Sequence, residues 1–266
     1  SLMSDLTVCE KAAILSKSIA LKVVLGVKCI LCIGGMVAAV RVLSKAGLSW
    51  LGSPLTRSTF IGHVLSSLLC SFLFGFCYCY DIVRLSLDHS DPCEYTLDLS
   101  LAFIARIIPV FGMFGSIYFM VCLAIERTFS TCAPACYDVF SKSRFSVNLI
   151  VLVVVILSLV VPLLFLVPPI DWNRRMYIFN TRTDENSAMF QIMIWLEIIP
   201  EVVAILVFHL VLYANTRRSP LSNLLYLAER VQIESNKRVI HIVLPLLWIH
   251  FAFNAFTSFG LQLYPF

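Results

Sequence analysis

Six long apolar runs dominate the pattern of hydrophobic and polar positions along the chain. A hydrocarbon core about 30 Å thick is crossed by about 20 residues of helix, and each run is long enough. A backbone in lipid must satisfy its own hydrogen bonds, so each run is predicted to be a helix. The runs mostly lack the polar stripe of soluble helices, which makes them membrane spans. The predicted spans are 21–40, 59–80, 101–125, 147–167, 189–213 and 239–263.

Composition supports a membrane protein with several spans. Hydrophobic residues make up 59% of the chain and charged residues 14%, whereas soluble proteins have roughly half and a quarter. No connecting segment is long enough to fold as a separate domain, so residues 1–266 are predicted to form a single transmembrane bundle. The bilayer is the expected partner, and a net charge of +4 gives no reason to expect nucleic acid.

The distribution of Lys and Arg predicts the orientation. The segments after the first, third and fifth predicted spans carry nearly twice as many of them as the other segments. The richer set belongs in the cytoplasm, so the N-terminus is expected to be extracellular. The chain stops at Phe266, directly after the sixth run. We therefore expect an all-α, receptor-like bundle of seven helices with the seventh missing; the alternative is a protein of six spans.

The inner end of the third predicted span carries an acid followed by an arginine, Glu126-Arg127. The planar guanidinium stays charged and binds acceptors in pairs. This end resembles that of the third helix in G-protein-coupled receptors, where the arginine switches between a neighbouring carboxylate and the G protein. The alternative is an interfacial pair that anchors the helix by snorkelling. The position in an N-out bundle favours the switch.

A longer resemblance extends this reading. The stretch Glu126-Arg127-Thr128-Phe129-Ser130-Thr131, followed by Tyr137-Asp138, resembles the E-R-x-x-A-T…Y-E signature of nematode serpentine chemoreceptors of the Sra and Srab kind. The stretch Arg230-Val231-Gln232-Ile233-Glu234-Ser235-Asn236 is similar to their R-Y-Q-[IL]-x-E-N motif, and Asp91-Pro92-Cys93 and Arg106 also fit that group. The chain departs from these patterns at Ser130, Asp138, Val231 and Ser235.

The resemblance implies a seven-span chemosensory receptor in the plasma membrane of sensory neurons. Such a receptor would bind a small molecule or peptide outside the cell and signal through a heterotrimeric G protein inside it. The residues expected to serve G-protein coupling are Glu126, Arg127, Arg230, Lys237 and Arg238.

Three ionisable residues inside the spans suggest a ligand site independently of the resemblance. A charge at the centre of a membrane helix costs about 2.5–3.5 kcal/mol on insertion scales, so such groups face the bundle and find partners. Glu197 and Glu201 share one face of the fifth span because they are four residues apart. Both cannot easily ionise there, so a nearby cation is expected, and Arg106 matches the depth of Glu197.

We expect these groups to form the floor of an outward-facing pocket; a structural ion pair is the equally weighted alternative. The candidate ligand-binding residues are Arg106, Val110, Met113, Glu197 and Glu201. A second possible function is a transporter that uses Arg106, Glu197 and Glu201 to couple substrate or protons. Against it, the two halves show no repeat and no matching pair of broken spans.

The sequence gives no reason to expect an enzyme, because no recognisable nucleophile, metal motif or acid-pair motif is present. Neither a metal nor a cofactor is expected. Among the ten cysteines, Cys9 and Cys93 are clearly in predicted outer segments and are the disulfide candidates, while Cys77 and Cys79 lie near the outer edge. The sequence alone does not decide the pairing.

Overall fold

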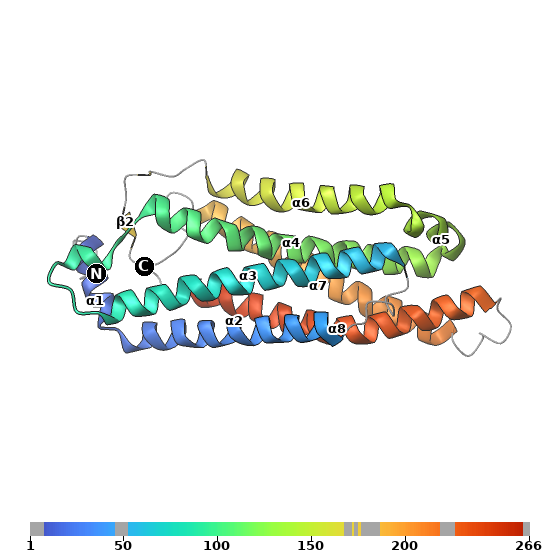
Figure 1. Ribbon diagram of the computed structural model, residues 1–266, viewed down its shortest axis with the longest axis horizontal. Coiled ribbons are helices and arrows are strands. Elements are labelled where there is room, and N and C mark those ends of the chain that lie inside the picture. Colours follow the sequence, from blue (N-terminus) through green and yellow to red (C-terminus); the bar gives the residue numbers. More distant parts are fainter. Residues whose placement is uncertain are drawn as a thin grey trace. The chain divides into compact units, whose positions relative to one another are not determined.

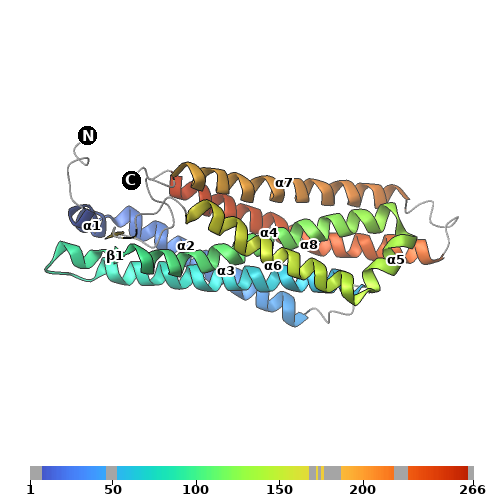
Figure 2. The same cartoon turned by 90° about the horizontal axis from the view of Figure 1, so that it is seen from above.

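The computed structural model describes residues 8–45, 53–167, 172, 175–176, 187–218 and 227–262. This part of the chain is almost entirely helical, with one pair of two-residue strands (Figures 1 and 2). The elements in chain order are α1 (Val8–Ser16), α2 (Ile19–Lys45), α3 (Pro54–Ser86), the 3₁₀ helix η2 (Pro92–Tyr95), β1 (Leu97–Asp98), α4 (Leu99–Cys132), α5 (Pro134–Lys142), α6 (Arg144–Leu166), β2 (Arg175–Met176), α7 (Ser187–Arg218) and α8 (Leu227–Gln262).

Within the described residues, six helices are long and apolar enough to cross a membrane, namely α2, α3, α4, α6, α7 and α8. The six predicted spans and the all-α membrane class are thereby confirmed. Most of these helices extend beyond the apolar runs, since a helix continues into polar sequence until a breaking residue stops it. The predicted end of the sixth span at 263 lies outside the described residues.

Proline and serine set several helix boundaries. Pro54 is the first residue of α3, and the Ser53 hydroxyl accepts a hydrogen bond from the Thr56 backbone N–H at 3.1 Å. This is the usual pairing of a serine N-cap with a proline in the first turn. Pro134 ends α4 and opens the short helix α5, because the residue before a proline disfavours the helical conformation; Ala133 has φ −138° and ψ 64°. The helix α5 is not among the elements predicted from the sequence.

The spanning helices differ greatly in how much of their surface is covered. In α4, 72% of the most apolar window is buried, against 22% in α6. α6 accordingly exposes a row of large aliphatic side chains, among them Leu152, Ile156 and Leu164. Lipid suits such a surface and water does not, so α6 is a lipid-facing helix and α4 is an interior one.

The chain divides into two compact units, and α2, α3, α4, α6 and α7 each contribute one segment to both. Unit 1 comprises residues 1–40, 67–113 and 159–193, and unit 2 comprises residues 41–66, 114–158 and 194–266. The predicted single bundle over residues 1–266 stays a prediction.

Unit 1 contains the N-terminal helix and the connection between α3 and α4. A disulfide joins Cys9 of α1 to Cys93 of η2, 84 residues further along the chain. Closing so long a loop restricts the unfolded chain, which stabilises the folded one by about 2–4 kcal/mol. β1 pairs with β2 in antiparallel fashion, with Leu97 opposite Met176. The disulfide thus links α1 to η2, and the strand pair links residues 97–98 to residues 175–176.

Unit 2 has a core of large apolar side chains from the first half of α3, the second half of α4, and parts of α7 and α8. Its most buried members include Phe60, Phe114, Met120, Phe208 and Leu247. α3 and α4 approach closely at Gly62, where an added Cβ would lie 2.6 Å from the Phe119 ring. A glycine is needed at this crossing. In the same unit, α5 turns the chain from α4 into α6 (Figures 1 and 2).

Candidate functional site

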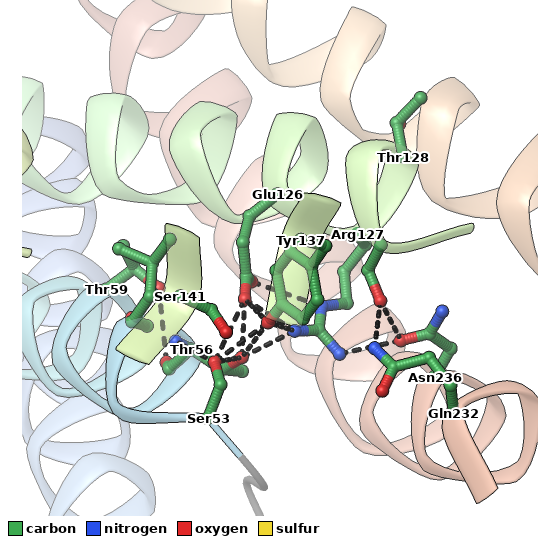
Figure 3. Close-up of polar contacts among 12 residues, drawn as sticks. Ser53, Thr56, Thr59, Glu126, Arg127, Thr128, Tyr137, Ser141, Gln232 and Asn236 are labelled. Atoms are coloured by element: carbon green, nitrogen blue, oxygen red, sulfur yellow. Dashed lines mark hydrogen bonds and ion pairs between the residues drawn. The ribbon is translucent and has the colours of Figure 1, made fainter. Parts of the chain in front are cut away.

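A buried polar cluster surrounds the Glu126-Arg127 pair near the end of α4, in unit 2 (Figure 3). The side chains come from α4, from the start of α3 with its cap, from α5 and from α8. Glu126 and Arg127 are 5% and 2% exposed. Two charged groups buried this deeply must find their partners within the protein.

The Glu126 carboxylate accepts several hydrogen bonds. The Thr56 hydroxyl donates to Oε1 at 2.6 Å, and the Tyr137 hydroxyl donates to the same oxygen. Arg127 Nε donates to Oε2 at 3.1 Å, and its Nη2 donates to Oε1. The neighbouring arginine therefore neutralises the acid, and two hydroxyls satisfy it further.

The guanidinium of Arg127 connects α4 to its neighbours. Nη1 donates to Asn236 Oδ1 of α8 at 2.8 Å. Nη2 donates to the Tyr137 hydroxyl of α5 at 2.8 Å and to the Thr56 hydroxyl of α3. One planar donor group thus bridges three elements besides its own, which a compact lysine ammonium could not do in the same geometry.

A second set of hydrogen bonds lies one turn further along α4. The Thr131 hydroxyl accepts from Asn215 of α7 at 3.0 Å and from Asn236 of α8 at 3.1 Å. Ser130 donates to Asn236 Oδ1 at 3.1 Å and accepts from Gln232. Asn236 is therefore tied to α4 at three residues, and it is 1% exposed. Polar networks satisfied in this way fix one arrangement of their helices.

Burial also affects Tyr137, which lies outside the spanning helices. Removal from water raises the pKa of its phenol, and the Glu126 carboxylate acts in the same direction while Arg127 opposes it. The phenol therefore keeps its proton and can donate to Glu126 while accepting from Arg127.

The structure brings together only part of the predicted G-protein-coupling set. Glu126 and Arg127 form the centre of the cluster. Arg230 and Arg238 are exposed on α8, and Lys237 is half-buried and pairs with Glu234 at 3.1 Å. The centre of the cluster is a buried charge pair. The three α8 cations are more exposed and take no part in the hydrogen bonds described for that pair.

Most residues of the cluster had no predicted role. Tyr137 and Asn236 stood in the quoted motif stretches, and that was a usable signal. Thr56 gave none, because a threonine near the start of an apolar helix is ordinary. The motif stretches 126–131, 137–138 and 230–236 meet at Arg127.

The predicted ligand-binding residues are all buried but fall in both units. Arg106, Val110 and Met113 lie on the unit 1 segment of α4, and Glu197 and Glu201 lie on the unit 2 segment of α7. Their assembly into one pocket stays a prediction, as does the Arg106–Glu197 pair.

Glu201 has partners that the sequence analysis did not foresee. Its carboxylate accepts from His250 Nδ1 at 2.6 Å and from Asn254 Nδ2 at 3.2 Å, both on α8. His250 Nε2 lies 2.8 Å from the hydroxyl oxygen of Ser116. The backbone carbonyl oxygen of Ser116 lies 2.9 Å from His63 Nδ1. Helices α3, α4, α7 and α8 are thus linked through His250, which is half-buried, and His63, which is buried. Within the described residues, no group of three or more His, Cys, Asp or Glu side chains could hold a metal ion.

Comparison with known families finds one that spans nearly the whole chain. Residues 6–265 match the sequence model described as "Serpentine type 7TM GPCR receptor class ab chemoreceptor". Comparison with curated proteins finds no match.

Proposed function

The chain belongs to the serpentine class ab family of seven-transmembrane chemoreceptors, and we propose that it binds a small extracellular ligand and activates a heterotrimeric G protein. The match over residues 6–265 supports a receptor rather than the alternative transporter. The protein is a multi-pass membrane protein, and its proposed location is the plasma membrane of a sensory neuron.

The observation that carries the proposal is the buried Arg127 cluster. A charge pair at the end of the most buried spanning helix could simply anchor that helix at the membrane surface. An anchor would leave the guanidinium at the interface with water, however, whereas Arg127 is 2% exposed and bridges α3, α5 and α8. This arrangement suits a two-state element better than an anchor.

In the proposed mechanism, this closed cluster is the resting state. Ligand binding favours an arrangement in which α8 leaves the unit 2 segment of α4, and Arg127 loses Asn236. The freed guanidinium then binds an acceptor on the G protein, as a planar donor group does well. A ligand shifts the equilibrium only by its differential affinity for the two states, so the resting cluster must be stable but not overwhelmingly so.

The proposed orientation follows from the excess of Lys and Arg on the segments around this end of α4. The N-terminus is extracellular, and the ends of α4 and α7 and the start of α8 lie in the cytoplasm. An acidic or polar surface of the G protein would then contact the three α8 cations Arg230, Lys237 and Arg238. Their positive charge would attract the G protein over a long range.

Epitope tags test this orientation. A tag at the N-terminus should bind antibody on intact cells, whereas a tag inserted within 219–226, between α7 and α8, should bind only after permeabilisation. A soluble cytoplasmic protein carrying the same tag controls for leaky cells. Antibody binding to the 219–226 tag on intact cells would reverse the topology and remove the proposed G-protein site.

Substitution of Arg127 tests the proposed signalling role. Membranes from cells that express the receptor and a heterotrimeric G protein should bind GTPγS without ligand. This basal binding of GTPγS to the G protein, called basal GTPγS uptake below, should exceed that of receptor-free membranes. Arg127→Ala should reduce this uptake to the receptor-free level at equal surface expression, because the group proposed to engage the G protein is gone. Arg144→Ala is the matched control, since it removes the same charge from an exposed position at the start of α6. Unchanged uptake with Arg127→Ala would leave only the anchoring role.

A further inference from the structure

Unit 1 contains a pair of buried cations that share one aromatic ring and that the Arg127 mechanism does not use. Lys28 of α2 is 2% exposed and Arg106 of α4 is 4% exposed. Both contact the same aromatic ring: Lys28 Nζ lies 5.6 Å and Arg106 Cζ 4.8 Å from the centroid of Tyr78 of α3. Two like charges gathered in a low-dielectric setting repel each other, so this arrangement is costly without an anion.

The protein neutralises these cations only in part. Arg106 Nη2 donates to the Tyr78 hydroxyl at 3.0 Å, and its guanidinium lies 4.3 Å from the Phe74 ring centroid. Arg106 Nη1 is buried and has no hydrogen-bond partner among the described residues. A buried donor without an acceptor is rare in proteins and marks a place where a partner is missing.

Among the described residues of unit 1, no acid pairs with Lys28 or Arg106. The ionisable groups that act on Lys28 are Arg106 and Cys32, neither of which is a carboxylate. Asp81 acts on Arg106 from a distance, but it is engaged at 2.8 Å by Arg84. This group of side chains in unit 1 contains three cations, Lys28, Arg106 and Arg84, and one acid, Asp81. It therefore carries two uncompensated positive charges.

We propose that Arg106 and Lys28 together bind the acid group of a small organic acid. This inference rests on the proposed function in taking that acid to be the ligand of the receptor. A carboxylate has two oxygens, one for the free Nη1 of Arg106 and one for the ammonium of Lys28, and it would cancel most of the local charge. Phe74, Tyr78, Cys32 and Cys77 surround the cations, so the remainder of the acid should be apolar or aromatic.

Matched acids and alcohols test the proposal on the purified receptor in phosphatidylcholine nanodiscs, without a G protein. The probes are acetate, hexanoate, benzoate and phenylacetate, each compared with the alcohol of the same carbon skeleton. At least one acid should raise the melting temperature while its alcohol does not. Lys28→Met should weaken the binding of that acid by about tenfold or more, the loss expected for a charge-assisted hydrogen bond.

A second readout separates binding from a structural role. Lys28→Met should raise the melting temperature of the empty protein by about 2 °C or more, because it removes an uncompensated buried charge. Lys22→Met is the matched control on the same helix, since Lys22 is half-buried, and it should change neither acid binding nor the melting temperature. Arg106→Lys should also weaken acid binding, because it removes the free Nη1 donor.

Several results would overturn the proposal. One is that no acid stabilises the wild-type protein more than its alcohol. Another is that Lys28→Met lowers the stability of the empty protein, as expected for a structural lysine. A third is that phosphatidylserine in the nanodisc reproduces the stabilisation, which would assign the site to a lipid headgroup. A different pair of results separates this site from the proposed function. If the acid binds as expected but Arg127→Ala leaves basal GTPγS uptake unchanged, the proposed function is contradicted and the acid-binding site is still supported.

Discussion

Replacing Asn236 with leucine is expected to raise basal GTPγS uptake severalfold in membranes that contain the receptor and its G protein. Asn236 accepts from Arg127 Nη1 at 2.8 Å and from the Ser130 hydroxyl at 3.1 Å, and it donates to Thr131 at 3.1 Å, so the substitution removes three ties between α8 and α4. A hydrogen bond to a charged group contributes about 1.5–3 kcal/mol, which corresponds to about tenfold or more in the equilibrium between resting and active receptor.

The matched control is Asn148→Leu, the same change at an exposed position on α6. It should leave basal uptake at the wild-type level. The comparison requires equal surface expression, which an extracellular N-terminal tag reports. Basal uptake with Asn236→Leu at or below the wild-type level would mean that the α4–α8 contact does not restrain the receptor.

The second large effect is expected at Glu201, which is fully buried. Glu201→Leu should reduce the free energy of unfolding by about 3 kcal/mol, because it leaves His250 and Asn254 without the carboxylate that accepts their hydrogen bonds. Thermal unfolding of the purified protein in nanodiscs measures the loss. Glu234→Leu removes an exposed acid whose pair with Lys237 contributes little, so it should change stability by less than about 1 kcal/mol.

A double substitution separates the pair from the single residue. His250→Leu alone should also destabilise the protein, since it removes a partner of Glu201 and of Ser116. The double variant Glu201→Leu/His250→Leu should be less destabilised than the sum of the two. Additive losses would show that the two groups do not stabilise each other in the membrane.

The sequence was sufficient for the spans because length and hydropathy decide them. Each spanning helix has one apolar run of about 20 residues or more, and nothing else in the chain competes with that signal. The short elements α1, α5, β1 and β2 lacked such a signal, since their positions depend on contacts made after the long helices have formed. α5 was marked only by Pro134, which indicates a helix start without giving its length.

The site was predictable to the extent that its residues are adjacent in sequence. Glu126 and Arg127 are neighbours, so their pairing could be inferred from their order. The link between Glu201 and His250 joins residues 49 positions apart on different helices, and no spacing rule relates them. Depth in the membrane suggested Arg106 as the cation for Glu197, and that pair stays a prediction, since depth does not report which face of a helix a side chain occupies.

The central claim is that Arg127 acts on the G protein when α8 releases it. The most direct test is the basal GTPγS uptake of the double variant Arg127→Ala/Asn236→Leu, measured beside the two single variants at equal surface expression. If the gain from Asn236→Leu works through Arg127, the double variant should show only the uptake of receptor-free membranes. Uptake that stays as high as with Asn236→Leu alone would show that α8 activates the G protein without Arg127, and would contradict the proposed switch.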